Sequence, residues 1–190
     1  MRLALFASGT GSNVQAILDS VKKGSLDAEA VCLVCDQPGA KVIEKAQKES
    51  LPYLVLSPKQ CSSRESWEKQ ILEFLIHHQV DLIILAGFMR ILGQELLAAF
   101  PKKVLNIHPS LLPKFPGRQG IKDAFEAKVK ETGVTVHFVD EGIDTGEIIA
   151  QEKISLPHDW TLEQLEAAIH RIEHELYPAT IQTVIEKGRK

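Results

Sequence analysis

The chain of 190 residues has only three cysteines, too few for the disulfide framework of a small secreted domain. We therefore expect a reducing, cytoplasmic environment. Cys32 and Cys35 form a C-x-x-C pair inside the apolar run 30–35. Residues three apart on a strand point to opposite faces, so these two thiols should pack in the core rather than share a metal ion. No other ligand spacing indicates a metal site, and we expect none.

Long apolar runs and an excess of basic charge are also missing. The longest apolar run, Leu82–Met89, is far shorter than the roughly 20 residues of a membrane-spanning helix. Met1–Gly9 is too short for a signal peptide and is better explained as a first strand. Lys and Arg number 22 against 25 Asp and Glu, which argues against a nucleic acid or an anionic membrane as the main partner.

The first hundred residues predict strands that alternate with helices, the order that gives a parallel sheet with helices on both faces. The strands are expected at Leu3–Ala7, Ala30–Cys35, Tyr53–Leu56 and Asp81–Ala86. The helices are expected at Asn13–Lys23, at Ala40–Glu49 and, from a capping box at Ser62–Glu65, up to His78.

The second half predicts antiparallel strands added to that sheet. The elements expected are a helix at Gly93–Phe100, a strand at Val104–His108, a helix at Ile121–Val129, and strands at Val134–Val139 and Ile148–Ile154. The connection between the last two strands is too short for a helical crossover, so they should be antiparallel. A capping box at Thr161–Gln164 begins the last helix, which Pro178 should kink or break. The fold class is therefore α/β, a single Rossmann-like domain.

A glycine-containing turn, Ser8–Asn13, lies between the first strand and the first helix. Its glycines allow a ligand to approach the backbone, and the free amides of a helix N-terminus favour an anion. The turn lacks the lysine of a Walker A loop, and Val14 stands where a dinucleotide fingerprint needs its third glycine. Asp36 does follow the second strand, where a ribose-binding acid is expected. The turn predicts a phosphate or nucleotide site.

Asn106 and His108 are two residues apart on a predicted strand, so both side chains should leave the same face at the ligand-binding end of the sheet. An amide donor beside an imidazole suits the stabilisation of an oxyanion in acyl chemistry. The acidic loop 140–147 includes Asp144, and a carboxylate there could orient the imidazole and favour its charged form. His137, inside a strand, is interpreted as a structural histidine.

Five strings in the chain resemble the folate-dependent phosphoribosylglycinamide formyltransferases. They are Ser8–Asn13, Ala86–Arg90, Asn106–Pro113, Val136–Gly146 and Glu173–Pro178. The resemblance implies transfer of a formyl group from 10-formyltetrahydrofolate, as co-substrate, to the amine of glycinamide ribonucleotide in purine biosynthesis, without a metal. It also implies one domain, 1–190, with a mononucleotide-binding half, 1–100, and a catalytic and folate-binding half, 101–190. The partners would be these small molecules, and the enzyme a monomer or homodimer.

The resemblance also assigns residues. Asn106, His108 and Asp144 would be catalytic; Gly11, Ser12, Asn13 and Glu173 would bind the ribonucleotide; and the folate would contact Arg64, Met89, Arg90, Ile91, Leu92, Asn106, Val139 and Asp140. The direction of Glu173 on its helix alone suggests a position at the rim, or simply on the surface. Two places depart from the expected pattern, since Gly117–Gly120 replaces a loop that often carries His or Ala and Glu147 replaces a common Pro.

Two other functions stay open at this point. A methionyl-tRNA formyltransferase shares the central strings, but it would carry a further RNA-binding domain, and this chain stops near residue 190 with a net charge of −3. A nucleotide-binding Rossmann module without catalysis would explain the glycine turn and Asp36. It would leave the shared face of Asn106 and His108 unexplained.

Overall fold

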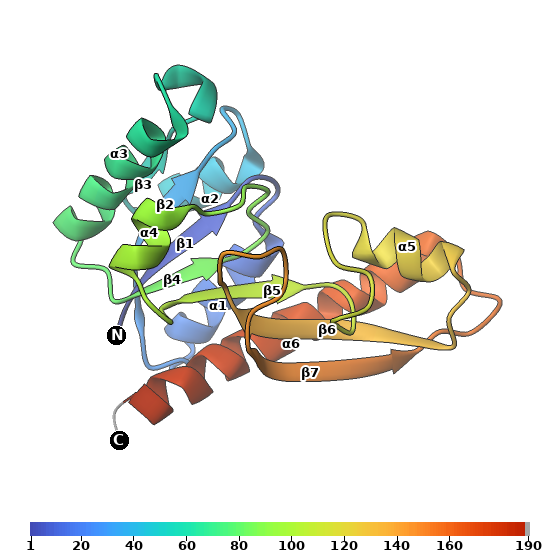
Figure 1. Cartoon of the computed structure of the whole chain (residues 1–190). Helices are drawn as coiled ribbons and strands as arrows, with labels where there is room; N and C mark the ends of the chain where they lie inside the picture. Colours follow the sequence, from blue (N-terminus) through green and yellow to red (C-terminus); the bar gives the residue numbers. More distant parts are fainter. Residues whose placement is uncertain (189–190) are drawn as a thin grey trace.

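A computed structural model describes residues 1–188, and its central element is a sheet of seven strands in the order β3-β2-β1-β4-β5-β6-β7 (Figure 1). The strands are β1 (Arg2–Ala7), β2 (Glu29–Cys35), β3 (Tyr53–Val55), β4 (Leu82–Leu85), β5 (Val104–His108), β6 (Glu131–Phe138) and β7 (Ile148–Ser155). The first five are mutually parallel, whereas β6 is antiparallel to both β5 and β7. The α/β class and the antiparallel addition in the second half are confirmed.

Helices cover the two faces of the sheet unequally. They are α1 (Ser12–Lys22), α2 (Lys41–Lys48), α3 (Arg64–His77), α4 (Gln94–Ala99), α5 (Gly120–Glu126) and α6 (Leu162–Gly188), with a 3-10 turn at Pro58–Gln60. Buried residues of α1, α2 and α6 form one core with the sheet, and those of α3 and α4 form a second core on the opposite face (Figure 1). Cys35 belongs to the first core and Cys32 to the second, as expected from their spacing.

Three predicted helix ends were wrong. The cap of α3 is Ser63, whose hydroxyl accepts a hydrogen bond from the Ser66 amide, so this helix begins one residue later than the predicted capping box. Helix α5 ends at Glu126, and Lys128 then adopts a left-handed φ of 51° that a helix cannot continue through. Helix α6 passes Pro178 without a break.

The continuity of α6 has a packing explanation. Tyr177, Ile181 and Ile185 on both sides of the proline are fully buried against the sheet, and this burial outweighs the one backbone hydrogen bond that a proline removes. The Tyr177 hydroxyl lies 2.9 and 3.0 Å from the carbonyl oxygens of Leu85 and Leu105, so it holds α6 where β4 and β5 meet. The capping box between Thr161 and Gln164 is confirmed.

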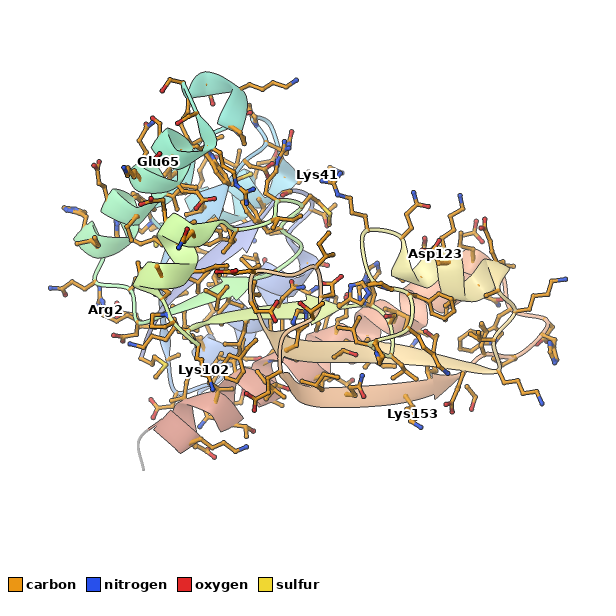
Figure 2. All side chains as sticks on the ribbon, in the orientation of Figure 1. Arg2, Lys41, Glu65, Lys102, Asp123 and Lys153 are labelled. Carbon is orange, nitrogen blue, oxygen red and sulfur yellow. The ribbon has the colours of Figure 1, made fainter. Side chains whose placement is uncertain are left out.

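Charged side chains lie mainly around the outside of the fold. Figure 2 shows Arg2, Glu65, Lys102, Asp123 and Lys153 pointing away from the sheet at widely separated places. No helix within residues 1–188 combines the length and the apolar character needed to cross a bilayer. The order of the strands reverses between β1 and β4, and crevices at such a reversal are where open α/β sheets bind ligands.

Candidate active site

A pocket of about 270 Å³ opens where β4, β5 and β6 end. Its walls come from the segment after β4, from the end of β5 and from the loop between β6 and β7, which folds back over β5 (Figure 1). This loop is attached to β5, because the Val139 amide donates to the Val104 carbonyl at 2.9 Å. The pocket lining includes all three predicted catalytic residues: Asn106, His108 and Asp144.

His108 is buried and is held by the proline-rich loop that follows it. Its Nε2 lies 2.7 Å from the Phe115 carbonyl oxygen, and because a carbonyl only accepts, Nε2 carries a hydrogen and donates. The ring is thereby fixed with Nδ1 3.5 Å from Asp144 Oδ2. Both nitrogens of His108 face acceptors, an arrangement that satisfies the doubly protonated imidazolium. Nδ1 is thus the nitrogen available for chemistry beside Asp144.

Asp144 reaches the strand residues because its loop is tightly turned. Asp144 itself has a left-handed φ of 55°, a conformation in which Asp is enriched among non-glycine residues. Its Oδ2 accepts a hydrogen bond of 2.8 Å from the Gly117 amide, which ties the loop to the proline-rich segment. Asp140 shapes the same loop by accepting from the Gly142 amide and the Thr145 hydroxyl.

Asn106 and His137 are directly opposite each other in the antiparallel register of β5 and β6. The Nδ1 atom of His137 donates to the Phe138 carbonyl at 2.8 Å, which leaves Nε2 to accept from the Asn106 amide at 3.2 Å. Asn106 Nδ2 and His137 Nε2 lie 3.5 and 3.6 Å from Asp144 Oδ1. His137 is therefore part of the site, and its interpretation as a purely structural histidine was wrong.

The environment of Asp144 keeps its carboxylate charged. Burial by itself would raise the pKa of Asp144. The hydrogen bond that His137 donates once its Nε2 is protonated, the hydrogen bond from the Gly117 amide and the positive charges of protonated His108 and His137 together outweigh burial and hold this pKa below its ordinary value. At neutral pH the Asp144 carboxylate is therefore ionised, and it lies between two imidazoles. From this position it can accept a proton from either side and pass it on.

Seven of the eight residues that the resemblance assigned to folate line the pocket: Met89, Arg90, Ile91, Leu92, Asn106, Val139 and Asp140. The eighth, Arg64, lies outside the lining. Its guanidinium donates to the Ile91 carbonyl at 2.8 Å and pairs with Glu68 at 3.0 Å. Arg118, from the segment that departs from the expected pattern, also lines the pocket and donates to the Met89 carbonyl. A direct contact of Arg64 with folate stays a prediction.

The glycine turn forms an open helix N-terminus beside this pocket. Gly11 caps α1 with a left-handed φ of 71°, no side chain caps the helix, and no acidic residue lies in its first turn. A Cβ atom at Gly11 would lie 2.4 Å from Val42 Cγ2, so the position requires glycine for both conformation and space. The start of α1 therefore has no side-chain cap of its own, as an anion site would require, and phosphate binding by the amides of residues 11–13 stays a prediction.

Glu173 faces the same turn from helix α6. It is 5% exposed, so the alternative of a surface glutamate was wrong. Glu173 Oε2 accepts from Asn13 Nδ2 at 3.3 Å and from His170 Nδ1 at 2.8 Å. Asn13 Oδ1 and the neighbouring His174 Nε2 are buried without a hydrogen-bond partner among residues 1–188. The structure thus brings together the residues that the resemblance assigns to ribonucleotide binding. The two unpartnered atoms beside them are free to bind a ligand.

Asp36 does not serve as the ribose-binding acid of a dinucleotide site. Its side chain is fully buried and accepts hydrogen bonds from Ser8, Gln37 and Arg90. Burial opposes its ionisation, but these three donors and the charge of Arg90 hold the pKa of Asp36 below its ordinary value. The Asp36 carboxylate is therefore engaged by other side chains of the protein. It no longer supports the alternative of a nucleotide-binding Rossmann module without catalysis. No cluster of three metal-ligating side chains occurs in the described part of the chain.

Comparison with known proteins agrees with this geometry. The formyl transferase family model matches residues 1–181. Phosphoribosylglycinamide formyltransferase from Bacillus subtilis is 48% identical over 184 residues, which cover 97% of this chain and 94% of that protein. The trifunctional purine biosynthetic protein adenosine-3 of Drosophila melanogaster is 40% identical over 97% of this chain, which spans only 14% of that protein.

Solved structures show the same likeness. Phosphoribosylglycinamide formyltransferase from Bacillus halodurans superposes with a TM-score of 0.96 at 47% identity, covering 99% of this chain and 97% of that one. Glycinamide ribonucleotide transformylase 1 from Geobacillus kaustophilus gives a TM-score of 0.94 at 52% identity, with 96% and 97% covered. The chain therefore belongs to the formyl transferase family, as an enzyme of its phosphoribosylglycinamide formyltransferase branch.

Proposed function

We propose that the enzyme transfers the formyl group of 10-formyltetrahydrofolate to the amine of glycinamide ribonucleotide, using Asn106, His108 and Asp144. The observation that carries the proposal is their convergence on one pocket, with Asp144 oxygens 3.5 Å from both Asn106 Nδ2 and His108 Nδ1. An amide donor, an imidazole and an ionised carboxylate are the groups that acyl transfer between two nitrogens requires. Branch membership supports the same substrates.

The reaction forms one bond between carbon and nitrogen and breaks another. The neutral glycinamide amine attacks the formyl carbon and gives a tetrahedral intermediate with an oxyanion. The amide of Asn106 and the protonated Nδ1 of His108 stabilise that oxyanion, at about 3–4 kcal/mol for a well-placed donor. The proton of the attacking nitrogen passes through Asp144 or a water to the folate nitrogen, which leaves as tetrahydrofolate. Asp144 is the side chain that can carry this proton, because it lies beside both His108 and His137.

The folate ring would occupy the pocket. Met89, Ile91 and Ile143 all line it, with 49%, 51% and 57% of their surface exposed, and apolar surface gathered in this way at one place indicates a binding site. An aromatic ligand would cover them and remove apolar surface from water. The three proposed catalytic residues, Asn106, His108 and Asp144, line the same pocket.

The ribonucleotide would bind across the strand-order reversal. Its phosphate would accept hydrogen bonds from the amides of Gly11, Ser12 and Asn13 at the start of α1, and Glu173 would accept from its ribose or glycinamide end. Glu173 is ordered for this role by Asn13 and His170, which both donate to Oε2. We propose that the protein acts in the cytoplasm on these small molecules, as a monomer or homodimer.

A formyl-transfer assay with two acceptors tests the proposal. The enzyme is mixed with 10-formyltetrahydrofolate and either glycinamide ribonucleotide or charged initiator tRNA, and the formylated product is measured. We expect product only with the ribonucleotide. Transfer to the tRNA alone would contradict the proposal, and a protein that transfers to neither acceptor while it binds both the ribonucleotide and a folate analogue would show that the catalytic assignment is wrong.

A further inference from the structure

The wall of the pocket formed by residues 87–93 has no regular secondary structure of its own. This segment, called the pocket wall below, connects β4 to α4 and contributes Met89, Arg90 and Ile91 to the site. A loop without a helix or strand ladder keeps its shape only through contacts with its surroundings. The hydrogen bonds that hold the pocket wall therefore determine how well the folate subsite is formed before the substrate arrives.

One end of the pocket wall is attached to Asp36 and Ser8. The Ser8 hydroxyl donates to Asp36 Oδ1 at 2.5 Å and accepts from the Met89 amide at 2.8 Å. Arg90 Nε donates to Asp36 Oδ2 at 2.7 Å. Ser8 and Asp36 immediately follow β1 and β2, so two rigid strands carry this anchor. Neither residue lines the pocket.

The other end of the pocket wall is attached to Glu68 on helix α3. Glu68 is 2% exposed, and its Oε1 accepts from the Gly93 amide at 2.8 Å and from Arg64 Nε at 3.0 Å. Arg64 also donates to the Ile91 carbonyl. A Cβ atom on Gly93 would lie 2.4 Å from Glu68 Oε1, so glycine is what allows the carboxylate this close to the backbone.

The two anchors follow one pattern. Each is a buried carboxylate that binds an amide of the pocket wall, directly or through one hydroxyl, and each is neutralised by an arginine. Buried carboxylates are costly for stability unless they are fully paired, and apolar residues of similar size commonly serve the core as well. Their presence at both ends of an irregular wall indicates that they fix geometry there.

We infer that Asp36 and Glu68 are positioning residues, which hold the pocket wall in the shape that receives the folate. The inference rests on the proposed function for the identity of the ligand. It requires that loss of either carboxylate weakens folate binding more than ribonucleotide binding, because the turn that carries the amides of residues 11–13 is held separately, by the start of α1 and by the hydrogen bond from the Val42 amide to the Gly9 carbonyl.

The test compares Asp36→Asn and Glu68→Gln with Asp159→Asn, a matched loss of one carboxylate at an exposed position. Hydrogen exchange of the Met89 and Gly93 amides is measured without substrate, followed by KM for both substrates. We expect faster exchange within 87–93 and a rise of about tenfold in KM for 10-formyltetrahydrofolate, as for other residues that orient a site from behind. KM for the ribonucleotide should change less than about twofold, and the control should match wild type.

Ser8→Ala keeps the inference testable if Asp36→Asn fails to fold. It removes the acceptor of the Met89 amide but leaves the ion pair between Asp36 and Arg90 intact, and we expect about a fivefold rise in KM for folate from the loss of one hydrogen bond. A folded variant with wild-type exchange in 87–93, or with an equal rise in both KM values, would overturn the assignment. Absence of formyl transfer in wild type would instead contradict the proposed function, and the exchange data would still decide whether the carboxylates hold the wall.

Discussion

The two halves of the sheet offer polar groups to their ligands in different ways. In the parallel half, the start of α1, which follows β1, carries the backbone amides of residues 11–13, and no side chain caps the helix. In the antiparallel half, β5 and β6 present the side chains of Asn106, His108 and His137 on registered strands. A fourth side chain, that of Asp144, reaches them from the loop after β6.

The difference follows from strand geometry. A parallel strand leads into a helix, whose first amides are free whatever their side chains are. An antiparallel pair places particular side chains opposite each other at a fixed spacing. Catalysis needs this, because each catalytic group must lie close to the atoms that react. If the proposed function holds, the parallel half depends on backbone conformation for binding, and the antiparallel half on side-chain identity for catalysis. Substitutions should separate these two dependences.

The largest effect is expected for Asn106→Ala, in the antiparallel half. Loss of one oxyanion donor should lower kcat by about 10²–10³-fold. The melting temperature should change little, because Asn106 is only half-buried. Lys103→Ala, an exposed change just before the same strand, is the control for kcat and melting. An Asn106→Ala enzyme with wild-type kcat would remove the amide from the mechanism.

Gly11→Val should give the next largest effect, and it acts on binding. The valine side chain would collide with Val42, and the turn would hold this valine at a left-handed φ, with a strain of about 1–3 kcal/mol. KM for the ribonucleotide should therefore rise about tenfold or more. Ser12→Ala should have a mild effect, since only its backbone is used. Gly24→Val is the control, because Gly24 also has a left-handed φ but has open space around it. It shows what backbone strain alone does away from the proposed phosphate site. Equal, small changes in all three variants would mean that the turn does not bind the phosphate.

Glu173→Ala should weaken ribonucleotide binding about fivefold and leave the affinity for a folate analogue unchanged. Glu173 contacts Asn13 and His170, and it is absent from the lining of the folate pocket. Calorimetric titration with each ligand separates the two effects. If the variant binds the ribonucleotide as wild type does, Glu173 serves only to join α6 to α1.

The smallest effect concerns the pH dependence of stability at His170. The hydrogen bond to Glu173 raises the pKa of His170 above its ordinary value of 6.5, with burial acting in the opposite direction. The folded protein therefore retains this proton to a higher pH than the unfolded chain. The resulting stability is fully present below pH 6.5 and is lost as the pH rises through the raised pKa.

Urea denaturation of wild type and His170→Gln between pH 5 and 9 measures this linkage. The difference in unfolding free energy should be below about 1 kcal/mol, since the His170 side chain is half-exposed, and it should shrink as the pH rises. His158→Gln, at an exposed histidine in the connection between β7 and α6, is the control. A difference that grows with pH would contradict the assigned direction.

The sequence predicts the parallel half more completely than the antiparallel half. The alternation of strands and helices and the turn at Ser8–Asn13 are local patterns, and they give β1 to β4, and the turn that leads into α1, almost as observed. His137 was missed because its importance depends on the register that places it opposite Asn106, and register is a long-range property. The only sequence signal for His137 was that it lies on the strand predicted to follow the one that carries Asn106 and His108.

Asp36 and Pro178 show the same limit on local patterns. The position of Asp36 after β2 fitted a ribose-binding acid, but Ser8 and Arg90, distant in sequence, occupy its carboxylate. Pro178 is a helix breaker by propensity, yet the buried face of α6 keeps the helix continuous. In both places tertiary contacts decide between outcomes that the local sequence leaves open.

The division between binding and catalysis is tested most directly by single-turnover formyl transfer in Asp144→Asn, with Glu147→Gln as the control in the same loop. Asp144 lies between His108 and His137, whereas the Glu147 side chain is 69% exposed. We predict a transfer rate at least about 10²-fold lower in Asp144→Asn, with an unchanged Kd for the ribonucleotide and a control equal to wild type. A wild-type transfer rate in Asp144→Asn, or a rate restored by raising the ribonucleotide concentration, would contradict the catalytic role of this half.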